Sequence, residues 1–290
     1  MRILYIVGDS RSGSTVLQHL LSLQPGVHSI GELRRLGAMA RAGESCACGA
    51  PLRECEFWCE VCGEVPSEAR STEVPREGFI WRLTMLREAA ALRGGLSPAG
   101  KLFRGRAHSA AAECMSLYEA IAAKTGAELL VDSSKEPDHF LHLRASYPDL
   151  VEPVFLHRDG RGMVWSKMRR SERPADKAVA GFLWMQRMIE TARRAVGVHR
   201  ATEASYEAIC DDPRGQLERL LSPFKIPVET TDLGALSELR HDIGGSPSFQ
   251  GAERRTLQLD ERWRDEMPAE ALEHFEQRAG ELNRFRGYKD

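Results

Sequence analysis

A glycine-rich loop at residues 8–15, GDSRSGST, lies between two apolar segments of different periodicity. The preceding residues, 2–7, are mostly apolar and β-branched, which predicts a strand buried on both faces. The following residues, 13–23, carry apolar side chains at helical spacing. A strand, a glycine turn and a helix in this order direct the helix N-terminus at a bound anion. The chain is therefore expected to fold as an α/β protein that binds phosphate at its first loop.

The loop differs at one position from the phosphate-binding pattern G-x-x-x-x-G-K-[ST]. It keeps the spacing of Gly8, Gly13 and Thr15. Ser14 stands where nucleoside triphosphatases carry a lysine that reaches the β- and γ-phosphates. Arg11 offers a guanidinium three residues earlier. We therefore expect the loop to hold an anion but to lack the usual group for a triphosphate tail.

Two later apolar runs also end in polar residues. Residues 128–131 lead into DSSK, which ends at Lys135, and residues 153–157 lead into RDGR, which begins at Arg158. Open α/β sheets bind ligands outside the carboxyl ends of their strands, so both cations are expected near the loop. The alternation of strands and helices predicts a three-layer fold, with a parallel sheet flanked by helices. Further helices are expected at residues 78–92, 107–124, 162–171, 175–196, 213–224 and 270–285, and an irregular connection at 93–105. Residues 25–33 are expected to form a loop and a short strand that lead into a helix start at about Glu32, and residues 199–205 a further strand.

Composition limits the partners and the organisation of the chain. Basic side chains number 40 and acidic ones 42, which gives no reason to expect nucleic acid or an anionic membrane as partner. No segment approaches about 18 uninterrupted apolar residues, and the first residues do not resemble a secretory signal, so we expect a cytoplasmic protein without a transmembrane segment. We expect one domain over residues 1–290, with a Cys-rich and helical insertion at about 43–124 that caps the site.

Five of the seven cysteines fall within one short segment. They are Cys46, Cys48, Cys55, Cys59 and Cys62. A tight pair together with a C-x-x-C pair would supply four thiolates to zinc, whereas one or two disulfides, or free thiols, are the alternatives. The sequence leaves all three open. Cys114 and Cys210 lie in apolar, helix-like surroundings and are expected to be buried small hydrophobic residues.

Two segments resemble the signature segments of the sulfotransferases that use 3′-phosphoadenosine 5′-phosphosulfate (PAPS). They are residues 10–15, SRSGST, and residues 156–161, LHRDGR, the latter followed by Ser166. In that family the first segment holds the 5′-phosphosulfate, and the arginine and serine of the second hold the 3′-phosphate. Residues 205–207, SYE, resemble the family's tyrosine segment, and two arginines ahead of Trp263 resemble its C-terminal cofactor loop. The resemblance implies the P-loop nucleoside-triphosphatase-like fold of the family and a cofactor site formed by Arg11, Ser12, Gly13, Ser14, Thr15, Arg158, Ser166, Tyr206, Arg254 and Arg255.

The loop without a lysine suits this chemistry. PAPS carries no γ-phosphate and requires no magnesium, so Arg11 and Lys135 are expected to stabilise charge as the sulfuryl group passes in line to the acceptor, leaving 3′,5′-adenosine bisphosphate (PAP). A hydroxyl acceptor needs a base, for which we choose Glu32, although a glutamate at a helix start can instead interact with the helix dipole. The rival bases are His28, His108 and His139.

The sequence thus predicts a sulfotransferase that acts on a hydroxyl or amine of a small molecule, a carbohydrate or a lipid. Two other functions remain open. A small-molecule kinase on the same scaffold would favour lysine at position 14, which is serine here. A non-catalytic module that binds a nucleotide or zinc would keep the fold without the reaction.

Overall fold

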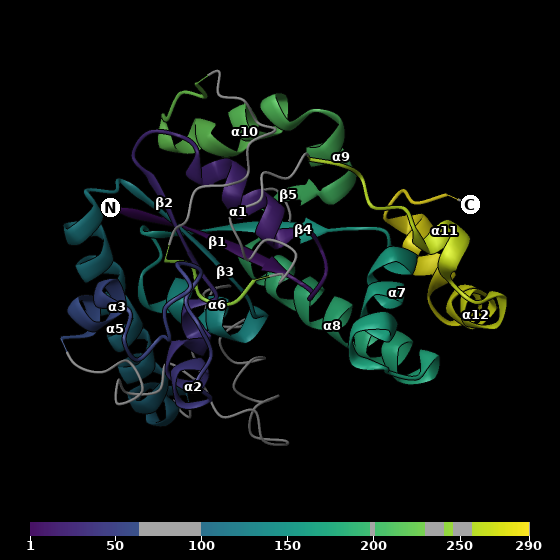
Figure 1. Cartoon of the computed structure of the whole chain (residues 1–290), viewed down its shortest axis with the longest axis horizontal. Coiled ribbons are helices and arrows are strands. Elements are labelled where there is room, and N and C mark those ends of the chain that lie inside the picture. The colour runs from purple at the N-terminus through teal and green to yellow at the C-terminus, as the bar shows by residue number, and fades with distance from the viewer. Residues whose placement is uncertain (64–99, 198–200, 230–240, 246–256, 290) are drawn as a thin grey trace.

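The computed structural model describes residues 1–63, 100–197, 201–229, 241–245 and 257–289, and side chains of residues 100–110 are not described. At its centre lies a five-stranded sheet in the order β2-β3-β1-β4-β5 (Figure 1). All neighbouring strands are parallel. The strands are β1 Arg2–Gly8, β2 Val27–Gly31, β3 Leu129–Lys135, β4 Val151–His157 and β5 Thr202–Ser205. The parallel sheet predicted from the sequence is therefore present.

The central strand β1 is buried on both faces, as its apolar sequence predicts. Ile3, Tyr5 and Val7 pack into one hydrophobic cluster, whereas Leu4 and Ile6 pack into another on the opposite face. Side chains alternate between the two faces of a strand, so each face must be covered by its own helices. This burial leaves only the ends of the strands open to a ligand.

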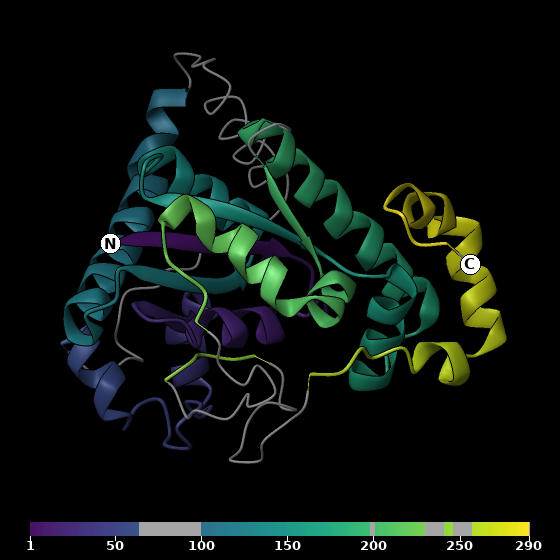
Figure 2. The same cartoon turned by 90° about the horizontal axis from the view of Figure 1, so that it is seen from above.

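Helices cover both faces of the sheet (Figures 1 and 2). α1 and α10 pack on one face, and α5, α6 and α8 pack on the other. A third cluster joins α7, α8, α11 and α12 beyond the strand ends. The helices are α1 Ser14–Ser22, η1 Leu33–Arg35, α2 Leu36–Arg41, α3 Glu56–Cys62, α5 Gly100–Thr125, α6 Pro137–Ser146, α7 Gly160–Ser171, α8 Ala175–Val196, α9 Tyr206–Asp211, α10 Pro213–Leu221, η3 Ser222–Phe224, α11 Trp263–Glu266 and α12 Ala269–Phe285.

Most predicted elements agree with the structure, and α8 has the predicted bounds. Strand β3 runs four residues beyond its predicted end, so the DSSK segment belongs to the strand itself. The prediction of an irregular connection is wrong for residues 100–105, because α5 already begins at Gly100. A glycine costs a helix only about 1 kcal/mol, too little to stop one that continues into the packed residues 111–125.

Part of the expected insertion can be followed in the fold. α3 and α5 contribute to the same hydrophobic cluster, through residues that include Trp58 and Tyr118. The predicted helix at 78–92 lies outside the described residues, so the cap remains a prediction. Within the described ranges, no helix combines the length and the apolar character needed to cross a membrane.

Candidate active site

The glycine-rich loop turns sharply between β1 and α1. Arg11 and Gly13 both have positive φ, 72° and 90°, which a glycine adopts readily and an arginine rarely does. A Cβ at Gly13 would lie 2.4 Å from the ring Cδ2 of Tyr206, so only glycine fits the close approach of α9. Because the first backbone N–H groups of a helix lack intrahelical partners, this turn presents donors to an anion at the start of α1.

The other predicted residues of the loop lie in or beside this turn. The Ser12 side chain is buried, and among the described residues its hydroxyl finds no hydrogen-bond partner. Ser14, where a triphosphatase would carry lysine, is the first residue of α1 and is buried. Thr15 lies next to Gly245, whose Cβ, if present, would be 3.6 Å from the threonine hydroxyl.

Helix α7 is fastened to the loop by two polar contacts. The Arg11 Nε donates to the Ser166 Oγ at 2.7 Å. The Lys167 Nζ pairs with the Asp9 carboxylate at 2.5 Å, with both side chains buried. Burial raises the pKa of Asp9, and the neighbouring ammonium opposes that rise. The sequence did not indicate the Asp9–Lys167 pair, which fixes the position of Ser166 beside Arg11.

Arg158, at the end of β4, lies against the same loop. Its guanidinium stacks 4.5 Å from the centre of the Tyr206 ring and donates to the carbonyl oxygens of Arg11 and Asp260, at 3.2 and 2.6 Å. The Tyr206 hydroxyl donates to the carbonyl of Gln258 at 2.9 Å. The structure thus brings together Arg11, Arg158, Ser166 and Tyr206, four of the residues that the resemblance implied.

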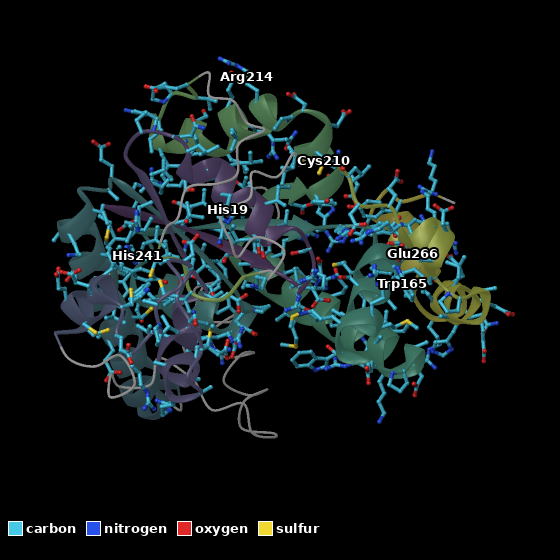
Figure 3. All side chains as sticks on the ribbon, viewed as in Figure 1. His19, Trp165, Cys210, Arg214, His241 and Glu266 are labelled. Carbon is cyan, nitrogen blue, oxygen red and sulfur yellow. The ribbon has the colours of Figure 1, made fainter. Side chains whose placement is uncertain are left out.

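These residues border a pocket of about 220 Å³ between the loop, α7 and α11, which we call the anion pocket. Its lining consists of Arg11, Arg158, Gly162, Trp165, Ser166, Arg169, Arg170, Asp260, Arg262 and Trp263. Figure 3 shows nitrogen-rich side chains gathered there, near the labelled Trp165 and Glu266. Three lining residues, Arg169, Arg170 and Arg262, were not predicted from the sequence. The first two lie near the end of the predicted helix after Arg158, and the third directly precedes Trp263.

Charge in the anion pocket is unbalanced, because five arginines face one aspartate. Burial, followed by the positive charges of Arg170 and Arg158, lowers the pKa of Arg11. Hydrogen bonds from Arg262 lower the pKa of Asp260 to about 2, with a further contribution from Arg158. Guanidinium groups crowded in this way repel one another, so the pocket suits a ligand with more than one negative charge.

A second group of polar side chains lies at the ends of β2 and β3. The Lys135 Nζ donates to the Glu32 carboxylate at 2.6 Å, and an Arg35 Nη1 donates to its other oxygen at 3.0 Å. Lys135 pairs in register with Val7, just before the loop. Burial alone would raise the pKa of Glu32, but the charge and hydrogen bond of Lys135 and the hydrogen bond from Arg35 lower it. Glu32 precedes the short helix η1 without making a capping hydrogen bond to it.

The rival bases and the remaining cofactor residues lie elsewhere or outside the described residues. His139 is buried in α6, where its Nδ1 contacts the Tyr5 hydroxyl at 3.0 Å and burial lowers its pKa to about 3. His28 lies in β2, with its ring 5.9 Å from that of Phe57. The side chain of His108 is not described. Arg254 and Arg255 lie outside the described residues, so their predicted contact with the cofactor remains a prediction.

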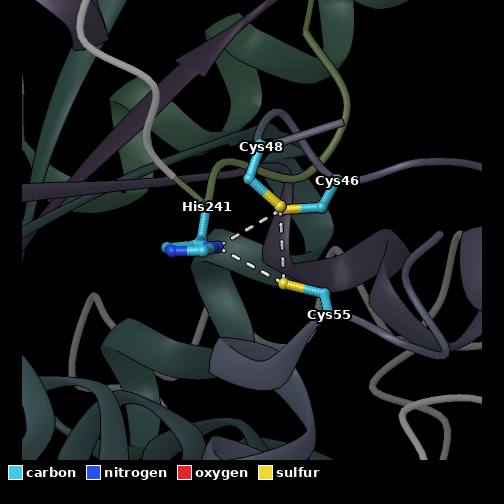
Figure 4. A group of neighbouring side chains, drawn as sticks. All are labelled: Cys46, Cys48, Cys55 and His241. Atoms are coloured by element: carbon cyan, nitrogen blue, oxygen red, sulfur yellow. Dashed lines mark hydrogen bonds between the residues drawn. The ribbon is translucent and has the colours of Figure 1, made fainter. Parts of the chain in front are cut away.

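The cysteines separate into two groups. Cys46, Cys48 and Cys55 lie together with His241, and one ligand atom from each falls within 4.8 Å of all the others (Figure 4). The remaining zinc candidates, Cys59 and Cys62, are not part of this Cys/His cluster, and the Cys59 thiol donates to the carbonyl of Arg53 at 3.3 Å. His241 is 186 residues from Cys55, and the sequence carried no signal for it. Elsewhere, Cys114 is buried as expected and Cys210 is only partly buried.

Comparisons with known proteins show which solved structures share this fold. No protein-family model matches the chain, and no curated protein matches its sequence. Among solved structures, the sulfotransferase domain from the Synechococcus PCC 7002 olefin synthase has a TM-score of 0.57 at 16% identity, covering 99% of this chain and 95% of that chain. The sulfotransferase domain from the curacin biosynthetic pathway has a TM-score of 0.51 at 16% identity, covering 95% of this chain and 96% of that chain.

Proposed function

We propose that this chain, which has the sulfotransferase fold, transfers a sulfuryl group from PAPS to a hydroxyl or amine of an acceptor. The observation that carries the proposal is the anion pocket, in which the guanidinium groups of Arg11 and Arg158 converge with Ser166 beside a loop that lacks the triphosphatase lysine. A donor with a 5′-phosphosulfate and a separate 3′-phosphate matches both the loop and the excess of positive charge.

Arg158 and Ser166 are proposed to bind the 3′-phosphate. Arg158 is already held by the Tyr206 ring and by two carbonyl oxygens, so little conformational freedom is lost when phosphate binds. Arg169, Arg170 and Arg262 line the same pocket and would add to the positive potential. We propose that the start of α1, with Ser12 to Thr15 and the Arg11 side chain, binds the 5′-phosphosulfate.

Glu32 and Lys135 are proposed to act at the sulfuryl group. In the reaction the acceptor oxygen forms a bond to sulfur, the bond from sulfur to the bridging phosphate oxygen breaks, and PAP leaves with that electron pair. Glu32 takes the proton of the acceptor hydroxyl, and Arg11 with Lys135 stabilises the developing charge. If Lys135 turns from Glu32 toward the sulfuryl oxygens, its lowering of the Glu32 pKa is lost while that of Arg35 remains, so the pKa rises from its value in the pair and Glu32 becomes a stronger base as the donor binds.

The acceptor is proposed to be a small molecule, a carbohydrate or a lipid, covered by the insertion at about 43–124. The names of both solved relatives point to biosynthetic proteins, which supports a small-molecule acceptor. A kinase is disfavoured by Ser14, because no lysine stands where a triphosphate would need one. A purely nucleotide-binding module is disfavoured by the Glu32–Lys135 pair next to the loop, which PAP binding alone would not require.

The proposal is tested by ligand-dependent melting followed by an acceptor screen. PAP at about 100 times its Kd should stabilise the folded chain by about 2.7 kcal/mol, whereas ATP with magnesium should have a smaller effect. Screening hydroxylated small molecules, sugars and lipids with labelled PAPS then identifies the acceptor. A larger stabilisation by ATP with magnesium would favour the kinase, and PAP binding without transfer to any acceptor would favour the non-catalytic module.

A further inference from the structure

We propose that Cys46, Cys48, Cys55 and His241 form a closed, tetrahedral Zn²⁺ site that joins the Cys-rich segment to the segment at 241–245. The proposal does not depend on sulfuryl transfer, because the four side chains lie apart from the anion pocket (Figures 3 and 4). Three thiolates and one imidazole are the ligand set of a structural zinc site, which leaves no position open for substrate.

Three distances between the ligand atoms are close to those around a zinc ion. In a tetrahedron with Zn–S near 2.3 Å and Zn–N near 2.05 Å, two sulfurs lie about 3.8 Å apart, and a sulfur and a nitrogen about 3.6 Å apart. The Cys48 and Cys55 sulfurs are 3.8 Å apart. The His241 Nδ1 lies 3.7 Å from the Cys46 sulfur and 3.3 Å from that of Cys55. A disulfide would instead need about 2.05 Å between two sulfurs, and two of the four groups would then have no role.

The backbone around the first two cysteines directs both thiols to one point. The N–H of Gly49 donates to the Cys46 carbonyl at 2.9 Å, and the N–H of Cys46 donates to the Ala50 carbonyl at 2.9 Å. Gly49 closes this turn with φ at 90°, a conformation that favours glycine. This turn therefore holds the Cys46 and Cys48 sulfurs on the same side. Cys55, the residue directly before α3, supplies the third sulfur.

The fourth ligand, His241, is held in place by its neighbours. Its ring is stacked on that of Phe57, with centroids 4.5 Å apart and planes 4° from parallel. The Trp58 indole N–H donates to the His241 carbonyl at 2.8 Å. The carboxylate of the next residue, Asp242, accepts from the Ser29 hydroxyl at 2.6 Å. Metal ligands are commonly oriented by contacts of this type, which fix the ring before the ion binds.

The site has a consequence for the candidate base. Ile243, two residues after His241, accepts a hydrogen bond from the Glu32 N–H at 2.7 Å and donates to the Ile30 carbonyl at 3.1 Å. A Cβ at Gly244 would lie 3.2 Å from the carboxyl carbon of Glu32, so that segment packs directly on the side chain. Zinc bound by His241 would therefore anchor the segment that positions Glu32.

The proposal is tested first by the metal content of the intact, full-length protein. We expect about one zinc ion per chain by mass spectrometry of the metal, and X-ray absorption should report three sulfurs and one nitrogen around it. Cys55→Ser and His241→Ala should lose the zinc. Cys59→Ser is the matched control, because its thiol lies in the same segment but outside the Cys/His cluster, and this variant should keep the full zinc content.

A second measurement on the unmodified chain covers the case in which those variants fail to fold. Chelation should remove the zinc and lower the Tm, and Zn²⁺ added back should restore both, while Co²⁺ should give the absorption typical of a tetrahedral thiolate site. Protein that refolds to the same Tm without zinc, binds no added Zn²⁺ or Co²⁺, or contains a disulfide between Cys48 and Cys55 after purification under reducing conditions would overturn the proposal.

Discussion

The anion pocket and the Cys/His cluster both gather side chains from distant segments, but they differ in charge and in closure. The pocket is open and is lined by five guanidinium groups and one carboxylate, so it carries an excess of positive charge that an anionic ligand would offset. The cluster brings four side chains to within 4.8 Å of one another, with their ligand atoms facing inward. Substitutions in the pocket should therefore change ligand affinity, whereas substitutions in the cluster should change stability and metal content.

Glu32 packs against the segment that carries His241, and Glu32→Gln should have the largest effect. A general base contributes about 100-fold or more to the rate, so turnover should fall by at least that factor. The PAP affinity and the zinc content should stay as in the unmodified chain, as measured by calorimetry and metal analysis. Glu44→Gln is the control, because Glu44 also faces Arg35, at 3.9 Å, but is about half exposed. Full activity in Glu32→Gln would exclude this carboxylate as the base.

Arg158→Ala should weaken PAP binding by about 2 kcal/mol, or about 30-fold, because it removes a charge-assisted contact to phosphate. The zinc content of this variant should be unchanged, because Arg158 lines the anion pocket and is not part of the Cys/His cluster. Arg214→Ala is the control, since Arg214 is half exposed and pairs with Glu218 on α10, outside the residues that line the anion pocket. Equal PAP affinities for the two variants would refute the assignment of Arg158 to the 3′-phosphate.

Gly13→Ala should disturb the pocket while sparing the cluster. Gly43 has a similar positive φ, 74° against 90°, but a Cβ there would meet no atom of the described residues within 4 Å, which makes Gly43→Ala the matched control. Both variants bear the cost of the left-handed backbone, and only Gly13→Ala adds a clash with Tyr206. Urea unfolding should show Gly13→Ala to be less stable than Gly43→Ala by about 1 kcal/mol. We also expect weaker PAP binding only in Gly13→Ala; equal stability and affinity would contradict the close packing of Tyr206.

Arg35→Ala should produce the smallest change, a shift of the acid limb of the pH–rate profile. Arg35 helps to lower the pKa of Glu32, so its removal should raise that pKa and move the limb to higher pH. The shift should be modest, because Arg35 is 48% exposed and Lys135 remains. By linkage, ionised Glu32 contributes stability above its usual pKa that is lost as the pH falls, and Arg35→Ala should reduce this contribution. An unchanged limb would mean that another group controls the rate.

Much of the fold could be predicted from the sequence because the relevant signals are local. The loop, the strand before it and the helix after it are adjacent in the chain, and α8 is identified by the spacing of its apolar side chains. β3 was predicted too short because its polar end, DSSK, is buried in the structure, where Asp132 accepts a hydrogen bond from Tyr118. From the sequence alone, a polar residue after an apolar run predicts the end of a strand, because its hydrogen-bond partner elsewhere in the chain is not visible.

The candidate site could be predicted only in part. Arg11, Arg158 and Ser166 belong to two short segments with a recognisable pattern, and the structure brings them together. The arginines that complete the pocket, Arg169, Arg170 and Arg262, belong to no pattern of their own. They reach it because α7 and α11 pack across the ends of the strands, and that packing is not encoded in any local spacing.

The sequence alone determined that this chain has an α/β fold and that its first loop has the spacing of a phosphate-binding loop without the lysine of a triphosphatase. Only the tertiary structure decided which distant groups meet: Lys135 with Glu32 over 103 residues, Lys167 with Asp9 over 158, and His241 with Cys55 over 186. The physical reason is that backbone geometry and side-chain periodicity act between near neighbours. Contacts across a parallel sheet depend instead on how every crossover helix packs.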